Sequence, residues 1–82
     1  MLLFAIFPVD EISRHIPLAM KIDKNISVVP AFRTEASANA FIQEKCKDGK
    51  FDVLELTLDD FDEVSMFARS SLKSDLYIKI HE

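Results

Sequence analysis

The chain has very little of the residues that build the most recognisable functional motifs. Its 82 residues include one glycine, Gly49, one cysteine, Cys46, and no tryptophan. A single glycine excludes glycine-rich phosphate loops and dinucleotide-binding fingerprints, because these need several glycines where the backbone approaches the ligand. A single cysteine excludes an intrachain disulfide, which suits a reducing compartment, so we expect a cytoplasmic protein.

Positive charge is also in short supply. Ten Lys and Arg residues stand against fourteen Asp and Glu residues, which gives a net charge of -4. Nucleic-acid binders and polybasic membrane anchors need a concentrated basic surface, so we expect neither nucleic acid nor membrane as a partner. The apolar run 2–7 is too short to span a membrane and lacks the basic start of a secretory signal, so it predicts a strand.

Known catalytic and metal-binding spacings are absent from the sequence. His15, His81 and Cys46 do not form a zinc-ligand pattern, and the acidic residues in 59–63 lack the glycine and terminal Glu of a calcium loop. No serine stands in a hydrolase motif. We therefore expect no catalytic, metal-binding or cofactor-binding residue, and the sequence does not favour an enzyme. Whether His15, His81 and Cys46 meet in the fold stays open.

A chain of this length predicts a single domain over 1–82. Alternation and turn residues indicate a β-hairpin around the turn at 23–25, because Asp and Asn accept tight turn conformations. The other predicted strands are apolar runs between turn or helix signals. The predicted strands are 2–7, 16–22, 26–32, 51–58 and 76–80, with a connecting loop at 70–75.

Two helices are predicted between the later strands. Thr34 is the expected N-cap of the first helix and Gly49 its stop, while Thr57 or Asp59 caps the second. Each helix carries one apolar stripe that should face the sheet. The stripes are Ala38, Phe41, Ile42 and Cys46 in the first helix, and Phe61, Val64, Ala68 and Leu72 in the second.

The element order is therefore βββαβαβ, which predicts an α+β fold. We expect a small mixed or antiparallel sheet of four to five strands with both helices on one face. Pro17 opposes a helix in the segment 9–22, because its ring would clash with the carbonyl four residues earlier. If 9–20 is helical instead, the order becomes βαβαβαβ, an open α/β sheet with helices for both faces.

The first strand is apolar on both of its faces, and this predicts how the chain assembles. If both helices cover one face, a second copy of the chain is the simplest cover for the other. We therefore predict a small association domain that forms a homodimer. Such a domain could also act as a regulator or adaptor of another protein. The expected interface residues are Leu3, Ala5, Phe7, Val53 and Met66.

The alternative is a small-molecule-binding or catalytic module. Its pocket would lie between sheet and helices or between subunits, and a few polar groups would line an otherwise apolar cleft. The side chains available for this role are Arg33, His15 and Tyr77.

Overall fold

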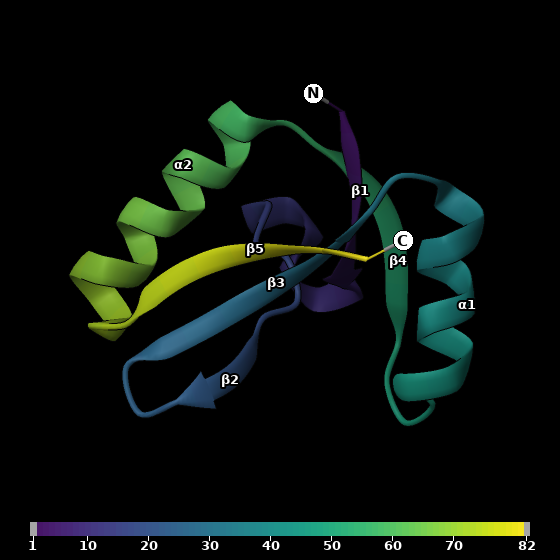
Figure 1. Ribbon diagram of the computed structural model, residues 1–82, viewed down its shortest axis with the longest axis horizontal. Helices are drawn as coiled ribbons and strands as arrows, with labels where there is room; N and C mark the ends of the chain where they lie inside the picture. Colours follow the sequence, from purple (N-terminus) through teal and green to yellow (C-terminus); the bar gives the residue numbers. More distant parts are fainter. Residues whose placement is uncertain (1, 82) are drawn as a thin grey trace.

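Five strands and two helices follow one another in the order βββαβαβ in the computed structural model, which describes residues 2–81 apart from the side chain of Leu72 (Figure 1). A short 3₁₀ helix follows β1, and a single π-helical turn follows α2. The strands are β1 (Leu3–Pro8), β2 (Met20–Asp23), β3 (Ile26–Phe32), β4 (Phe51–Leu56) and β5 (Asp75–His81). The helical elements are η1 (Val9–Arg14), α1 (Glu35–Lys45), α2 (Leu58–Phe67) and η2 (Ala68–Leu72).

The predicted α+β fold and its element order are confirmed. The segment between β1 and β2 contains only the 3₁₀ helix η1, which ends where His15 adopts a left-handed conformation with φ of 56°. Pro17 follows two residues later, so a longer helix cannot continue through this region. The predicted hairpin is also present, since β2 and β3 pair antiparallel around a turn at 24–25.

The strand β3 is the centre of the sheet. It pairs in parallel with β5 over its whole length, from Ile26 opposite Asp75 to Phe32 opposite His81. Its other edge is shared: β2 pairs with its first half, and β1 pairs with its last two residues. The strand β1 then pairs antiparallel with β4, so the sheet is mixed and open.

The prediction that both helices cover one face of the sheet is wrong. Figure 1 shows α1 and α2 on opposite sides of the sheet. The reason lies in the strand order: β3, β4 and β5 run in the same direction, but α1 connects β3 to β4 across the sheet one way and α2 returns to β5 the other way. Right-handed crossovers made in opposite directions place their helices on opposite faces.

The core accordingly has two layers, one on each side of β1. On the α2 side, the buried residues Ala5, Phe7, Val29, Leu56, Ala68 and Leu76 pack with Phe61 and Val64 of the helix. On the α1 side, Ile6, Phe32, Ala38 and Val53 pack with Phe41 and Ile42. Alternate side chains of β1 therefore enter different layers, as the geometry of a strand requires.

This arrangement also corrects the premise of the predicted dimer interface. Leu3, Ala5, Phe7 and Val53 are core residues of the single chain, with exposed fractions of 2%, 0%, 0% and 8%. Of the five predicted interface residues, only Met66 is exposed, at 69%. Both faces of β1 are covered from within, so its double apolar character does not require a second copy.

The helix starts agree with the sequence, but the end of α1 differs. Thr34 caps α1 by accepting a hydrogen bond from the Ser37 N–H, and Thr57 caps α2 by accepting one from the Asp60 N–H, each at 3.2 Å. The C-cap of α1 is Cys46 rather than Gly49. Gly49 lies in the following turn, where a Cβ atom would collide with the Phe51 ring.

The predicted apolar stripes are largely confirmed. Ala38 and Ala68 are buried, while Phe61 and Val64 are half-buried against the core. The Leu72 side chain lies outside the described residues. The predicted loop 70–75 begins as the π-helical turn η2 and leaves it at Lys73, which has φ of 51°.

Candidate functional site

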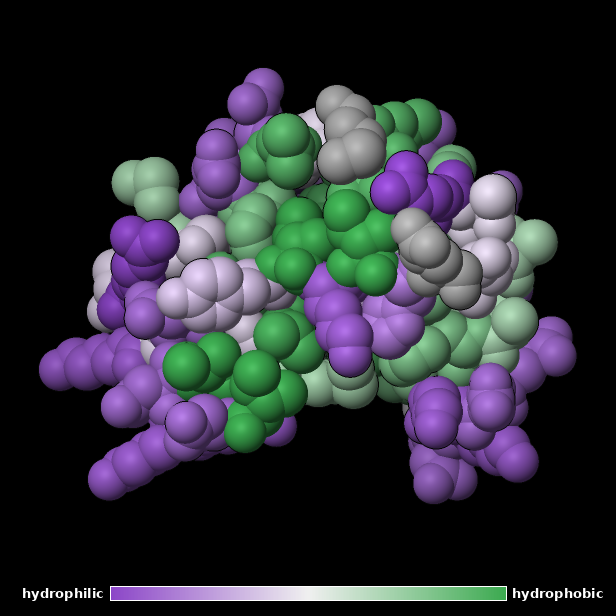
Figure 2. All heavy atoms as spheres, in the orientation of Figure 1, coloured by the Kyte–Doolittle hydropathy of each residue, from purple (hydrophilic) through white to green (hydrophobic). Residues whose placement is uncertain are grey.

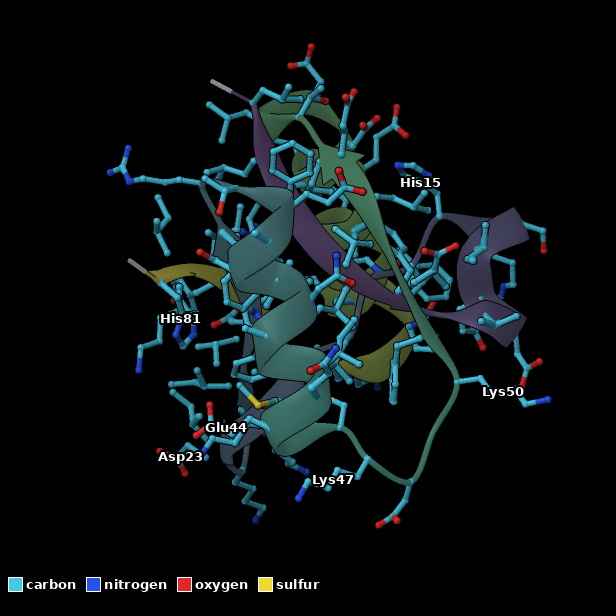
Figure 3. All side chains as sticks on the ribbon, turned by 90° about the vertical axis from the view of Figure 1, so that its right-hand side faces the viewer. His15, Asp23, Glu44, Lys47, Lys50 and His81 are labelled. Carbon is cyan, nitrogen blue, oxygen red and sulfur yellow. The ribbon has the colours of Figure 1, made fainter. Side chains whose placement is uncertain are left out.

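The two histidines and the cysteine, which are the side chains best suited to catalysis or metal binding, lie apart in the fold. His15 packs on the α2 side of the sheet, with its ring centroid 5.2 Å from that of Phe7. His81 stacks on Phe32 on the α1 side at 5.1 Å, and Figure 3 shows the two histidines at opposite sides of the molecule. Cys46 lies at the end of α1. In the described part of the chain, no group of three His, Cys, Asp or Glu side chains is placed to hold a metal ion.

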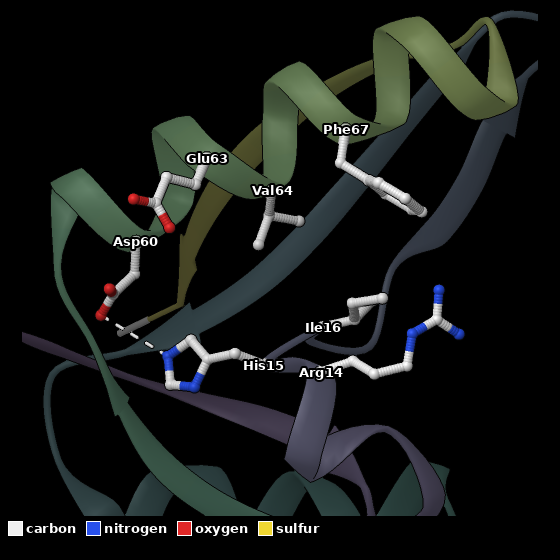
Figure 4. A pocket seen from close by; sticks show the side chains of 7 residues that line it. All are labelled: Arg14, His15, Ile16, Asp60, Glu63, Val64 and Phe67. Atoms are coloured by element: carbon white, nitrogen blue, oxygen red, sulfur yellow. Dashed lines mark ion pairs between the residues drawn. The ribbon is translucent and has the colours of Figure 1, made fainter.

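One cavity lies between the end of η1 and the helix α2 (Figure 4). Its volume is about 180 Å³. The Nε2 atom of His15 is 3.5 Å from the Oδ2 atom of Asp60, and the Arg14 guanidinium carbon lies 5.9 Å from the centre of the Phe67 ring. These contacts join the two elements across the cavity. The cavity is lined by Arg14, His15, Ile16, Asp60, Glu63, Val64 and Phe67.

The chemistry of this cavity is limited. Hydrogen bonding to Thr57, with a smaller contribution from His15, lowers the pKa of Asp60, so its carboxylate is charged at neutral pH. A His–Asp pair becomes catalytic when it activates a nucleophile, and none of the described lining residues is Ser, Thr or Cys. Small-molecule sites have volumes of about 300–1,000 Å³. We interpret the His15–Asp60 contact as a link that holds η1 against α2.

A larger groove lies between the end of α1 and the strand β2, and we name it the α1–β2 groove. Its volume is about 430 Å³. Four of its lining side chains are large and apolar, namely Leu18, Met20, Phe41 and Phe51. The remainder of the lining is Lys45, Cys46, Lys47, Asp48 and Gly49. Figure 3 shows Lys47 at the end of α1, where the chain turns toward β4.

The one thiol of the chain lines this groove. Cys46 is half-buried, and burial raises the pKa of its thiol, so the neutral form is favoured near neutral pH. A thiol of this kind is a poor nucleophile, and no histidine is among the described residues of the groove. The groove therefore offers an apolar floor and positive charge rather than catalytic groups.

The apolar surface continues from the groove onto the neighbouring strands. Met20 lies opposite Val28, and Val28 lies opposite Tyr77, so the three side chains share the α1 side of the sheet. Tyr77 is 53% exposed, and Ile22 at the tip of the hairpin is 64% exposed. Figure 2 shows hydrophobic side chains gathered over the β2–β3 hairpin. The α1 helix packs on the β1–β4 side of this face and leaves the hairpin open.

The polar residues expected to line a ligand pocket are distributed over the surface. His15 lines the smaller cavity, whereas Tyr77 lies on the other side of the sheet. Arg33 is exposed between β3 and α1 and lines neither cavity. The four apolar residues of the groove were missed in the sequence because each fits a core pattern in its own segment. The only sequence signal was the run of lysines at 45–50 after an apolar stripe.

Fold and groove together define a small α+β domain with a mixed, open sheet, a helix on each face and an apolar groove beside one helix. No known protein family and no curated protein matches its sequence. Its fold resembles that of Anabaena Tic22, a protein described by its role in protein transport. The TM-score is 0.61 at 14% sequence identity, and the match covers 98% of this chain and 41% of Tic22. The chain thus spans about two fifths of the length of that protein.

Within residues 2–81, none of the helices has the length and apolar character needed to cross a bilayer.

Proposed function

We propose that the chain is a protein-association domain that binds an extended segment of another polypeptide in the α1–β2 groove. The observation that carries this proposal is the groove itself, which has an apolar floor, a basic rim and no catalytic group among its described residues. Apolar grooves with a few polar contacts at their rim are a common mode of peptide recognition.

The charge of the rim indicates the chemistry of the segment. Lys45 and Lys47 outnumber the single acid, Asp48, although the chain as a whole carries a net charge of -4. A local excess of positive charge attracts acidic partners and sets their orientation. We therefore propose a segment in which apolar side chains are followed by one or more acidic residues.

The similarity in fold agrees with this proposal. Tic22 is described as a protein-transport protein. A domain that holds a polypeptide segment in a groove is compatible with a related role here.

The single, half-buried cysteine is compatible with a reducing compartment such as the cytoplasm.

Fluorescence polarisation with two labelled peptides tests the groove. One probe alternates Leu with Asp and Glu, and the other replaces the acids with Lys. We expect the acidic probe to bind more tightly and Lys47→Glu to weaken its binding about two- to fivefold, as for an exposed ion pair, with a smaller loss at high salt.

Two further variants separate the groove from general charge effects. Lys73→Glu changes the net charge equally but lies at the end of η2, away from the groove, so it should leave binding unchanged. Met20→Asp places a charge in the apolar floor and should abolish binding. Equal behaviour of Lys47→Glu and Lys73→Glu would show that the groove does not bind the probe.

A small molecule is the second candidate, because the groove volume of about 430 Å³ falls in the range of small-molecule sites. A thermal-shift screen with a metabolite panel tests it, since a ligand at 100 times its dissociation constant adds about 2.7 kcal/mol of stability. A shift that Met20→Asp removes would assign the groove to a small molecule.

A further inference from the structure

The three strands at the margins of the sheet differ in how their outer edges are protected. The strand β2 is short, and a bulge between Lys21 and Asp23 interrupts its pairing. In β4 the Asp52 carboxylate accepts a hydrogen bond from the Val53 N–H at 2.9 Å, which occupies a backbone donor. Short length, bulges and charged side chains are the usual ways of preventing one sheet edge from pairing with another.

The strand β5 is longer than β2 and has no bulge, and the charged side chains among its seven residues are Asp75 and Lys79. It contains no proline, its register with β3 is continuous, and in the described part of the chain it pairs only with β3. Figure 1 shows β5 running alongside β3. Tyr77 is 53% exposed and Ile80 is 36% exposed, and Figure 2 shows hydrophobic side chains in the middle of the face seen in Figure 1. The edge is therefore open, regular and partly apolar.

We infer that a second copy of this chain pairs antiparallel with β5, so that the two sheets join into one continuous sheet. A symmetric pair centred on Ile78 uses all seven residues of the strand and gives each side chain a compatible opposite. The opposed pairs are Asp75 with His81 of the partner subunit, Leu76 with Ile80 of the partner subunit, Tyr77 with Lys79 of the partner subunit, and Ile78 with Ile78 of the partner subunit.

The charges and side-chain types in this register are complementary. An acid meets an imidazole, an ammonium group meets an aromatic ring, and the remaining pairs are apolar. No like charges oppose each other. The register shifted toward the C-terminal end, centred on Lys79, would instead place two ammonium groups face to face and is disfavoured. Asp75 also lies 3.7 Å from Arg69 of its own chain, which further anchors its carboxylate at this edge.

Pairing along β5 would also affect binding in the α1–β2 groove. This consequence rests on the proposed function. The two-fold axis of an antiparallel pair is perpendicular to the sheet, so both α1 sides face the same way. The exposed Tyr77 side chains would lie at the seam, between the two α1–β2 grooves. A polypeptide long enough to reach both grooves would then bind with higher avidity than a short one.

Sedimentation velocity of the full chain over a range of concentrations tests the pairing. We expect a monomer–dimer equilibrium. Tyr77→Lys places a new lysine opposite Lys79 of the partner subunit in both symmetry-related pairs, so the dissociation constant should rise about tenfold. Tyr77→Glu places a carboxylate there instead and should leave the dimer as tight as the wild type or tighter. Tyr77 is half-exposed, so both variants should fold.

A double variant confirms the register. Lys79→Glu added to Tyr77→Lys restores opposite charges across the seam and should restore the wild-type dissociation constant. Hydrogen exchange provides a second measurement, because amides of β5 should become more protected as concentration rises. A chain that stays monomeric at all concentrations overturns the inference, as does a dimer in which Tyr77→Lys or the protection of β5 shows no effect.

The pairing and the groove can fail separately. Probe binding measured under conditions where the chain is monomeric reports on the groove alone. A permanent monomer that binds the acidic probe would overturn the pairing and leave the proposed function in place. A β5-paired dimer that binds no probe would do the reverse.

Discussion

Replacing the neighbouring residues Ile6 and Phe7 tests whether both faces of β1 are covered within one chain. Both side chains are 0% exposed, but they point into different layers, Ile6 toward α1 and Phe7 toward α2. Truncation of a buried Ile to Ala costs about 2–5 kcal/mol, and of a buried Phe to Ala about 3–5 kcal/mol. We therefore expect Ile6→Ala and Phe7→Ala to destabilise the chain by similar, large amounts.

The size of the effect makes it easy to measure. Folded domains have a total stability of only about 5–15 kcal/mol, so a loss of about 2–5 kcal/mol is a large fraction of it. In a domain of this size, each 1 kcal/mol lowers the melting temperature by about 4–8 °C. Urea denaturation followed by circular dichroism gives the free energy of unfolding directly. Should either variant fail to fold, Ile6→Val offers a milder change of about 0.5–1.5 kcal/mol.

The control is Ile22→Ala, at a position that is 64% exposed at the hairpin tip. Exposed substitutions of this kind usually change stability by less than about 0.5 kcal/mol. If one face of β1 were free in the monomer, one of the two neighbouring variants would behave like this control. A cost near zero for Ile6→Ala or for Phe7→Ala would therefore refute the two-layer core.

Three further predictions concern the ends of the helices. Thr34→Ala and Thr57→Ala remove the N-caps of α1 and α2, and each should cost about 1 kcal/mol in urea denaturation. Because hydrogen bonding to Thr57 lowers the pKa of Asp60, the carboxylate stabilises the fold at pH values above its unfolded pKa, and this contribution is lost as the pH falls through the folded pKa. Thr57→Ala should raise the pKa of Asp60 in an NMR titration, and an unchanged pKa would exclude Thr57 as its cause. Since burial raises the pKa of the Cys46 thiol, iodoacetamide should modify the folded chain more slowly than the urea-unfolded chain at mildly alkaline pH. Equal rates would contradict the burial of this thiol.

The sequence predicts the elements well because their signals are local. Thr34 and Thr57 stand where their side chains cap a helix, and the turn at 23–25 separates two alternating runs. The placement of the helices is not local. It depends on the direction in which each connection crosses the sheet, and therefore on strand order, which no residue pattern near Thr34 or Thr57 encodes.

The same limit applies to assembly and to the groove. An apolar strand such as β1 can be covered by a second chain or by helices of its own, and the two cases give the same pattern. The α1–β2 groove combines Leu18 and Met20 with Phe41 and Phe51, from three distant segments. Each of these residues fits a core position in its own segment, so only the assembled fold shows that they border an open surface.

The parallel pairing of β3 with β5 sets the order in which this chain can complete its fold. Ile26 pairs with Asp75 and Phe32 pairs with His81, and this pairing can form only after two helices and β4 have been synthesised. Pairing between such distant segments is slow, because the loop must close before its contacts form. A nascent chain that still lacks β5 has an open β3 edge and an incomplete α2 layer around Val29. A folding intermediate in which β5 has not yet paired is therefore prone to aggregation through the open edge of β3.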